Sequence, residues 1–214
     1  LMIVNRNWVE GEEVDEPKDW DPVRQLTTYL ETLFEASENV GYVTRSYEKD
    51  GRFLPEKGCY DRTAGKLIEL LSKCGGDLCS VIGDYNSGAG AWIRFNPLDG
   101  QGVRNDNVAE FRYALVESDE MAPSRQIAIM KSLELPIAAM VHSGNKSIHA
   151  IVKVDAPSYD EYRKRVTPAT LGSYRTADTS ARLLKRFAAG EKHITVEYLS
   201  LIHISEPTRR SYIS

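Results

Sequence analysis

Two stretches of the sequence indicate the architecture: Phe111-Arg-Tyr-Ala-Leu-Val-Glu-Ser-Asp119 and Pro136-Ile-Ala-Ala-Met-Val-His-Ser-Gly-Asn-Lys-Ser-Ile-His-Ala-Ile-Val-Lys-Val154. The first predicts a strand, on which alternate residues share one face. The second holds two apolar runs, separated by a turn that contains Gly144. Such a pattern is typical of two strands joined as a hairpin. The two stretches therefore predict three strands.

Helices are predicted on either side of this hairpin. Residues 123–133 carry apolar side chains at helical spacing, and Ser158 with Glu161 forms a capping box for a helix that ends near Val166. The order is then strand, helix, strand, strand, helix. We expect an α+β fold, in which the helices cover one face of the sheet.

The N-terminal half shows weaker patterns. Asp21-Pro22 is typical of a helix start, and predicts a helix over 22–36. A second helix is expected over 63–73, and short strands over 41–47 and 91–95. Residues 48–61 are expected to form a polar loop. Residues 1–20 are rich in acidic side chains and are expected to be a solvated lead-in.

Composition limits the class of protein. The chain has 214 residues and is 42% hydrophobic, enough for one substantial core. It contains no run of 18 apolar residues, so we expect no contact with a membrane. Its three cysteines fit no metal-binding spacing and are expected to be free thiols in a reducing cytoplasm.

The charge of the chain is unevenly distributed. The formal net charge is −4, so binding to nucleic acid would need a local basic surface. Residues 163–186 provide a candidate, because they hold seven basic residues against one acid, Asp178.

Glu117 and Asp119 form the first group with chemical potential. Carboxylates two residues apart on a strand point to the same side and repel each other. A divalent cation relieves that repulsion, and Mg²⁺ is typically held by one or two carboxylates and substrate phosphates. The alternative is an ordinary charged strand end.

The turn after the second strand forms another such group. Ser143, Lys146 and Ser147 provide donors at a glycine-containing turn, and His149 follows on the same face as Ser147. These side chains suit a triphosphate, although a polar hairpin tip is the alternative. A phosphate-binding loop of the Walker type is excluded, because Met140 and Asn145 occupy its two glycine positions.

Both groups, and the stretch Gly90-Ala-Trp-Ile-Arg-Phe-Asn-Pro-Leu-Asp-Gly100, resemble the archaeo-eukaryotic primase superfamily. More narrowly, they are similar to the primase-polymerase domains of phage and integrated-element replication proteins. The likeness extends from about residue 20 to Arg165. It implies a sheet core of the RNA-recognition-motif (RRM) type, antiparallel or mixed, with helices.

The resemblance also implies roles for individual residues. Glu117 and Asp119 match metal-binding acids, with Asp178 as a loose match for a third. His149 matches a catalytic histidine that contacts nucleotide phosphate. The remaining expected nucleotide-binding residues are Ser143, Lys146 and Ser147.

The implied reaction is template-directed nucleotidyl transfer that uses two Mg²⁺ or Mn²⁺ ions in DNA replication. Implied partners are a single-stranded DNA template and NTP or dNTP, with a replicative helicase, fused or separate, left open. Two other hypotheses remain. One is a metal-dependent nuclease of a mobile element that uses Glu117, Asp119 and Lys146 or Lys153. The other is a non-catalytic module that binds single-stranded DNA.

The expected catalytic domain covers residues 21–198, although 166–198 match the family pattern poorly. Residues 199–209 resemble a translated sequencing adaptor, so 199–214 are expected to be a non-native tail that packs poorly. We further expect Glu117 and Asp119 to face His149 across an open cleft. Replacing either acid with Ala is expected to abolish synthesis and leave the fold intact.

Overall fold

A computed structural model describes residues 21–117, 122–132, 135–142 and 148–166. These residues belong to two compact units, here called the N-terminal unit (21–110) and the C-terminal unit (111–166). The lead-in, the stretch 167–198 and the tail 199–214 lie outside the described residues. The boundary between the units falls inside the range 21–198, whose assignment to one catalytic domain stays a prediction.

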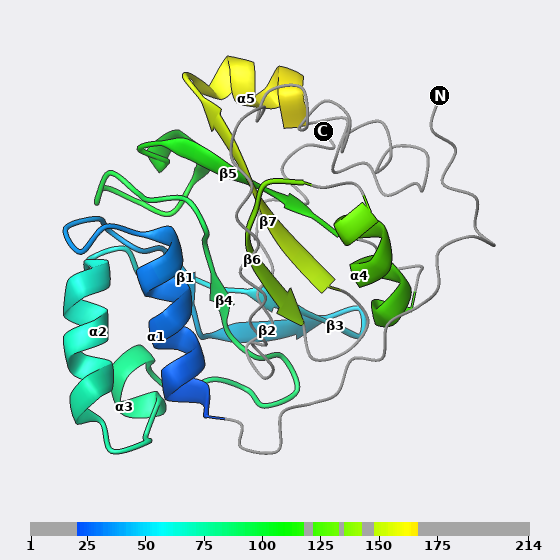
Figure 1. Cartoon of the computed structure of the whole chain (residues 1–214). Helices are drawn as coiled ribbons and strands as arrows, with labels where there is room; N and C mark the ends of the chain where they lie inside the picture. The colour runs from blue at the N-terminus through cyan, green and yellow to red at the C-terminus, as the bar shows by residue number, and fades with distance from the viewer. Residues whose placement is uncertain (1–20, 118–121, 133–134, 143–147, 167–214) are drawn as a thin grey trace. The chain divides into compact units, whose positions relative to one another are not determined.

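The elements of both units are shown in Figure 1. Those of the N-terminal unit are α1 (Pro22–Leu33), β1 (Tyr42–Val43), β2 (Ser46–Lys49), β3 (Arg52–Pro55), α2 (Ala64–Lys73), α3 (Cys79–Ile82), β4 (Trp92–Ile93) and the 3₁₀ helix η1 (Asn105–Asn107). Those of the C-terminal unit are β5 (Phe111–Val116), α4 (Pro123–Ser132), β6 (Ile137–His142), β7 (Ile148–Ala156) and α5 (Tyr159–Val166).

Helix α1 begins where the sequence predicts. The Asp21 carboxylate accepts hydrogen bonds from the backbone N–H groups of Val23 at 2.9 Å and Arg24 at 3.1 Å. This cap satisfies donors that the first helical turn leaves unpaired. The helix ends at Leu33, three residues earlier than predicted, and the chain is extended at Phe34.

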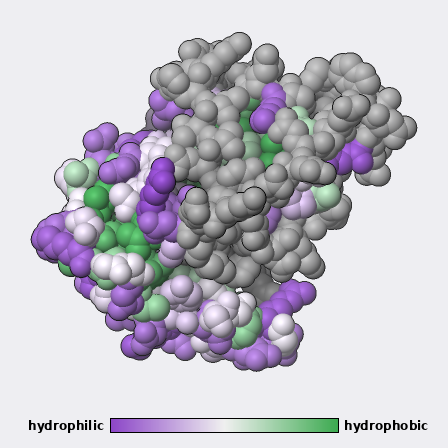
Figure 2. Space-filling view, turned by 60° about the horizontal axis from the view of Figure 1, so that its bottom comes forward, coloured by the Kyte–Doolittle hydropathy of each residue, from purple (hydrophilic) through white to green (hydrophobic). Residues whose placement is uncertain are grey.

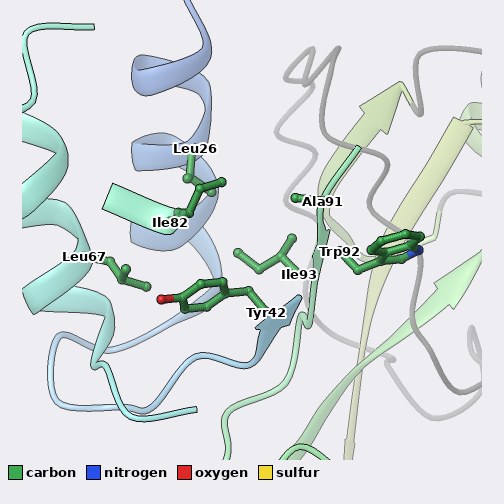
Figure 3. A pocket seen from close by; sticks show the side chains of 7 residues that line it. All are labelled: Leu26, Tyr42, Leu67, Ile82, Ala91, Trp92 and Ile93. Atoms are coloured by element: carbon green, nitrogen blue, oxygen red, sulfur yellow. The ribbon is translucent and has the colours of Figure 1, made fainter. Parts of the chain in front are cut away.

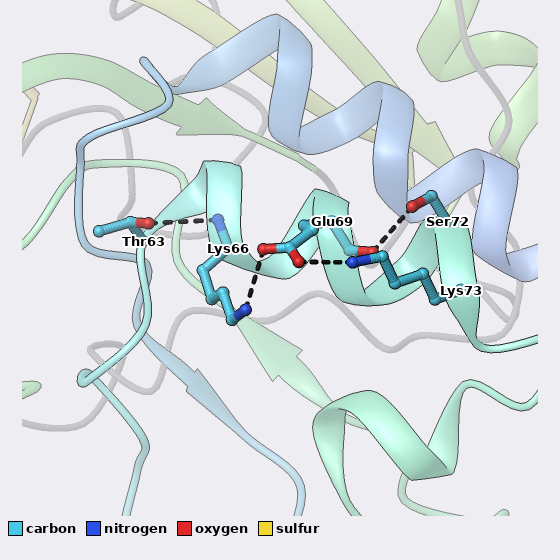
Figure 4. Close-up of polar contacts among 5 residues, drawn as sticks. All are labelled: Thr63, Lys66, Glu69, Ser72 and Lys73. Carbon is cyan, nitrogen blue, oxygen red and sulfur yellow. Dashed lines mark hydrogen bonds and ion pairs between the residues drawn. The ribbon is translucent and has the colours of Figure 1, made fainter.

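Helix α2 has a similar N-terminal cap and an ion-pair network on its exposed side. The Thr63 side chain accepts a hydrogen bond from the Lys66 backbone N–H at 3.2 Å. Glu69 pairs with Lys66 at 2.9 Å and with Lys73 at 2.6 Å, which Figure 4 shows along the helix. These contacts lie three and four residues apart, where side chains on a helix meet.

The core of the N-terminal unit contains a small apolar pocket between the helices and β1 and β4. Its lining residues are Leu26, Tyr42, Leu67, Ile82, Ala91, Trp92 and Ile93. Figure 3 shows the Tyr42 ring between Leu67 and Ile93. Burial, and next the neighbouring Cys59, raise the pKa of Tyr42 to about 12.

The expectation of a polar loop over 48–61 is wrong for residues 48–55, which belong to a β-hairpin. Strands β2 and β3 pair antiparallel, with Lys49 opposite Arg52. The two turn residues, Asp50 and Gly51, have φ values of 54° and 70°. Two positive φ values in a two-residue loop match the twist of the flanking strands, and Asp-Gly is a preferred sequence for such a turn.

The C-terminal unit is built on a three-stranded antiparallel sheet in the order β5-β7-β6. Strand β7 lies between its neighbours, with Ala150 opposite Val116 of β5 and His149 opposite Val141 of β6 (Figure 1). The three strands and both helices predicted for this part of the chain are confirmed. The fold is therefore mixed α+β with small antiparallel sheets.

One face of this sheet packs against the helices. Its core includes Ala114, Val116, Met140, Ile148, Ala150, Val152 and Val154 from the strands, with Ile127 and Met130 from α4. Tyr162 of α5 packs against the same core, and its ring centroid lies 5.2 Å from that of Phe111. The prediction of helices on one face is confirmed for the described helices.

Polar side chains dominate much of the surface that the structure describes. In the view of Figure 2 this surface is mostly hydrophilic, and hydrophobic residues show at the left and, over a smaller area, toward the upper right. Among the described residues, no helix is long and apolar enough to cross a membrane.

Candidate functional site

The candidate site lies on the sheet face opposite the helices. On this face Tyr113 of β5 pairs with Lys153 of β7, and Leu115 pairs with Ile151. Continuing the alternation by two residues on each strand brings Glu117 opposite His149. The sequence predicts both sets of alternating residues, and the observed register explains why a carboxylate and an imidazole meet here.

Glu117 and His149 are in direct contact. The His149 Nε2 atom lies 2.8 Å from the Glu117 Oε2 atom. His149 is 4% exposed, and the Glu117 side chain is 13% exposed. The expected proximity is observed, but the two side chains touch instead of facing each other across an open cleft. A buried carboxylate is costly without a partner, and the imidazole N–H provides one.

The contact assigns different roles to the two ring nitrogens of His149. An ionised Glu117 carboxylate only accepts hydrogen bonds, so the proton of this contact resides on Nε2. The Nδ1 atom is buried and has no hydrogen-bond partner among the described residues. A buried polar atom left unpaired costs roughly 1–3 kcal/mol. The Nδ1 atom is therefore the polar atom of this pair that the described residues leave unsatisfied.

Gln126 is a residue of this region that the sequence reasoning missed. It lies on α4, is 1% exposed, and its side-chain oxygen accepts a hydrogen bond from the Ile148 backbone N–H at 2.8 Å. Ile148 is the first residue of β7 and directly precedes His149. The available signal was a polar residue beside Ile127, on the apolar side of a predicted helix.

Several predicted site residues lie outside the described residues: Asp119, Ser143, Lys146, Ser147 and Asp178. Among the residues that are described, no three His, Cys, Asp or Glu side chains gather as a metal site. Because Asp119 and Asp178 lie outside the described residues, Glu117 is the predicted metal-binding acid whose position the structure describes.

Lys153, which the nuclease hypothesis invokes, lies on the same sheet face and further along β7 from His149. Its Nζ atom lies 3.6 Å from the Asp155 Oδ2 atom. The Lys153 side chain is 34% exposed. An ion pair this accessible to solvent contributes little to stability.

The three cysteines are free thiols, as the sequence predicts. Cys59 contacts Tyr42 and lies in the N-terminal unit, as do Cys74 and Cys79. All three cysteines therefore belong to a different unit from Glu117 and His149.

Comparisons with known proteins add no relative to this description. No family model, curated protein or solved structure matches the chain.

Proposed function

We propose that the chain carries the catalytic core of a DNA primase-polymerase, which transfers nucleotides to a growing strand under the direction of a single-stranded template. The observation that supports this most strongly is the contact between Glu117 and His149 on adjacent strands. The contact unites two residues that the family resemblance assigns to metal binding and phosphate binding. They come from separate sequence motifs, 32 positions apart.

The architecture of the C-terminal unit supports the same proposal. An antiparallel sheet in the order β5-β7-β6, with α4 and α5 on one face, is compatible with a core of the RRM type. The opposite face of the sheet carries Glu117 and His149. This separates the packing surface of the sheet from its reactive surface.

The donor chemistry at Glu117 suits a hard cation. Carboxylate oxygens are preferred ligands of Mg²⁺, and Glu117 supplies one such group on the reactive face. Glu117 and Asp119 would hold Mg²⁺ or Mn²⁺. When bound, such an ion would neutralise the charge that develops on the phosphates and would activate the attacking 3′-hydroxyl as a nucleophile.

His149 has two functions in this proposal. Its Nε2–H donates to Glu117 and fixes the position of that carboxylate. Its Nδ1 atom faces no described partner, and in the protonated imidazole it would donate to a phosphate oxygen of the nucleotide. The backbone and side chains of 143–147 would complete the phosphate site.

The test is primer extension by the full chain on a single-stranded template, with labelled nucleotides and Mg²⁺ or Mn²⁺. Glu117→Gln keeps an oxygen that accepts from His149 but removes the negative charge, so synthesis should fall on the order of 10²–10³-fold. The control is Glu31→Gln, the same change at an exposed position on α1. Full activity in Glu117→Gln would refute its assignment.

Nucleotide binding separates this proposal from the two other hypotheses. Lys146→Ala removes one positive charge from the proposed triphosphate site, so affinity should fall about ten- to a hundredfold. His149→Ala should act on the same ligand, and the two losses should not add. A nuclease or a passive DNA-binding module would show no nucleotide affinity. Absence of nucleotide binding by well-folded wild type would contradict the proposal.

A further inference from the structure

The β2–β3 hairpin displays two aromatic rings to solvent. Tyr47 is 47% exposed and Phe53 is 39% exposed, and among the described residues these are the exposed large hydrophobic side chains. The register places them on opposite faces of the hairpin, since Tyr47 pairs with Leu54 and Phe53 pairs with Glu48. A large part of each ring gains nothing from burial, so packing accounts for these side chains only in part.

The face that carries Tyr47 also carries positive charge. Lys49 and Arg52 lie directly opposite each other on this face. Arg45 precedes β2 and lies opposite Glu56, whose backbone N–H donates to the Arg45 carbonyl at 3.0 Å. Lys49, Arg52 and Arg45 are all exposed, and together with Tyr47 we call them the hairpin face.

The Lys49–Arg52 pair is unfavourable for the fold alone. Like charges directly opposite each other in an antiparallel pair are destabilising. None of the three cations forms an ion pair within the part of the chain that the structure describes. Local features that conflict with stability are expected where function requires them. An anionic ligand would relieve this repulsion.

The distribution of nearby acids leaves the hairpin face positive. Glu56 is the acid that shares this face, opposite Arg45. Glu48 points to the face of Phe53, and Asp50 lies in the turn. Three cations against one acid therefore flank the exposed Tyr47 ring.

We propose that the hairpin face binds single-stranded nucleic acid, with a base stacked on Tyr47 and phosphates near Lys49, Arg52 and Arg45. Unstacked bases offer a flat surface to an aromatic ring, while those of a duplex do not. Cations on the same face as such a ring can contact the phosphates that adjoin a stacked base, whereas an acidic peptide offers charge without flat rings. This gives the template of the proposed reaction a contact, yet it does not depend on Glu117 or His149.

Binding is measured by fluorescence anisotropy of the full chain with a labelled oligothymidylate of about 20 nucleotides, a length that exceeds common single-strand site sizes. Nucleotides and divalent metal are left out. Tyr47→Ala should weaken binding roughly five- to a hundredfold, as expected for loss of one stacked base. Tyr47→Phe keeps the ring and should bind like wild type. Phe53→Leu removes the ring from the opposite face and should also leave affinity unchanged.

The cations are tested through salt dependence. Each phosphate contact on a single strand contributes about 0.7 to the slope of log affinity against log salt. The double variant Lys49→Gln with Arg52→Gln should therefore lower that slope by about 1.4. Lys66→Gln with Lys73→Gln makes the same change in net charge on α2, where both lysines pair with Glu69, and should leave the slope near the wild-type value.

Three outcomes would overturn the proposal. They are absence of oligothymidylate binding by well-folded wild type, wild-type affinity in both Tyr47→Ala and the double variant, and equal competition by poly-aspartate of matched charge. Loss of primer extension in Glu117→Gln with intact oligothymidylate binding would support it. Because the binding assay contains no metal or nucleotide, failure of the catalytic proposal would not be mistaken for failure of this one.

Discussion

The side-chain oxygen of Gln126 accepts a hydrogen bond from the Ile148 backbone N–H at 2.8 Å, which ties helix α4 to the first residue of the central strand. The bond spans 22 positions of sequence. It fixes the point at which the chain enters β7, one residue before His149. A polar residue in the core of the unit thereby contributes to the position of the candidate site.

Gln126→Ala should lower the free energy of unfolding by about 1–3 kcal/mol, because it leaves the buried Ile148 N–H without its partner. Urea unfolding followed by circular dichroism measures the change. Gln101→Ala makes the same substitution in an exposed loop and should change stability by less than about 0.5 kcal/mol. Equal effects in both variants would show that the buried bond contributes nothing.

Glu117→Ala should destabilise the protein, contrary to the expectation from sequence that this change leaves the fold intact. The structure gives Glu117 a buried partner in His149, so truncation leaves the imidazole N–H unpaired at a cost of about 1–3 kcal/mol. Glu117→Gln keeps an acceptor and should cost less. Equal stability of the Ala variant, the Gln variant and wild type would mean that the contact is not formed in solution.

The free energy of unfolding should fall as the pH rises above 10, partly because of Tyr42. Its pKa is raised from 10.0 to about 12 by burial, and next by Cys59. Between these two values the folded state holds the proton that the unfolded chain releases, so the contribution of Tyr42 is full below pH 10 and lost through about pH 12. From about pH 9 to about pH 11 the loss should be on the order of 1 kcal/mol.

Tyr42→Phe should remove that part of the pH dependence, and unfolding titrations at the two pH values measure it. Tyr47→Phe is the matched control, because Tyr47 is 47% exposed. If the two variants lose stability equally with rising pH, burial does not govern the titration of Tyr42.

The Glu69 carboxyl should titrate near pH 2 in a carbon-detected NMR experiment. Hydrogen bonds from Lys73, and next from Lys66, lower its pKa from 4.5 to about 2. Lys73→Gln removes the first of these and should raise the pKa toward its ordinary value. Lys57→Gln, the same change at an exposed lysine that follows β3, should leave it unchanged. Added salt should weaken the shift in wild type, since the group is exposed.

Periodicity in the sequence predicted most of the C-terminal unit. Alternation at Tyr113, Leu115 and Glu117 placed those side chains on one face, and the observed register agrees. Both helices begin near their predicted first residues, and in the predicted capping box the Ser158 hydroxyl accepts from the Glu161 N–H at 3.3 Å. Such signals are local, so a single sequence contains them.

Contacts between distant residues were harder to predict. The hairpin was missed because polar residues such as Glu48 and Lys49 conceal a strand that buries little, although Asp50-Gly51 was a usable turn signal. The bond from Gln126 depends on the packing of α4 against β7, which no local pattern reveals. The direct contact of Glu117 with His149 required the strand register, which becomes known only when the pairing partners are known.

The central position of β7 has a consequence for its dynamics. Residues 148–152 are buried without interruption, and the strand is hydrogen-bonded on both sides. Amide protons in such a segment exchange with solvent only through large-scale opening. They should be among the slowest to exchange in this unit. The imidazole of His149 is thus carried by one of the stiffest segments of the backbone, and an arriving ligand would meet it already oriented, with little conformational entropy left to lose.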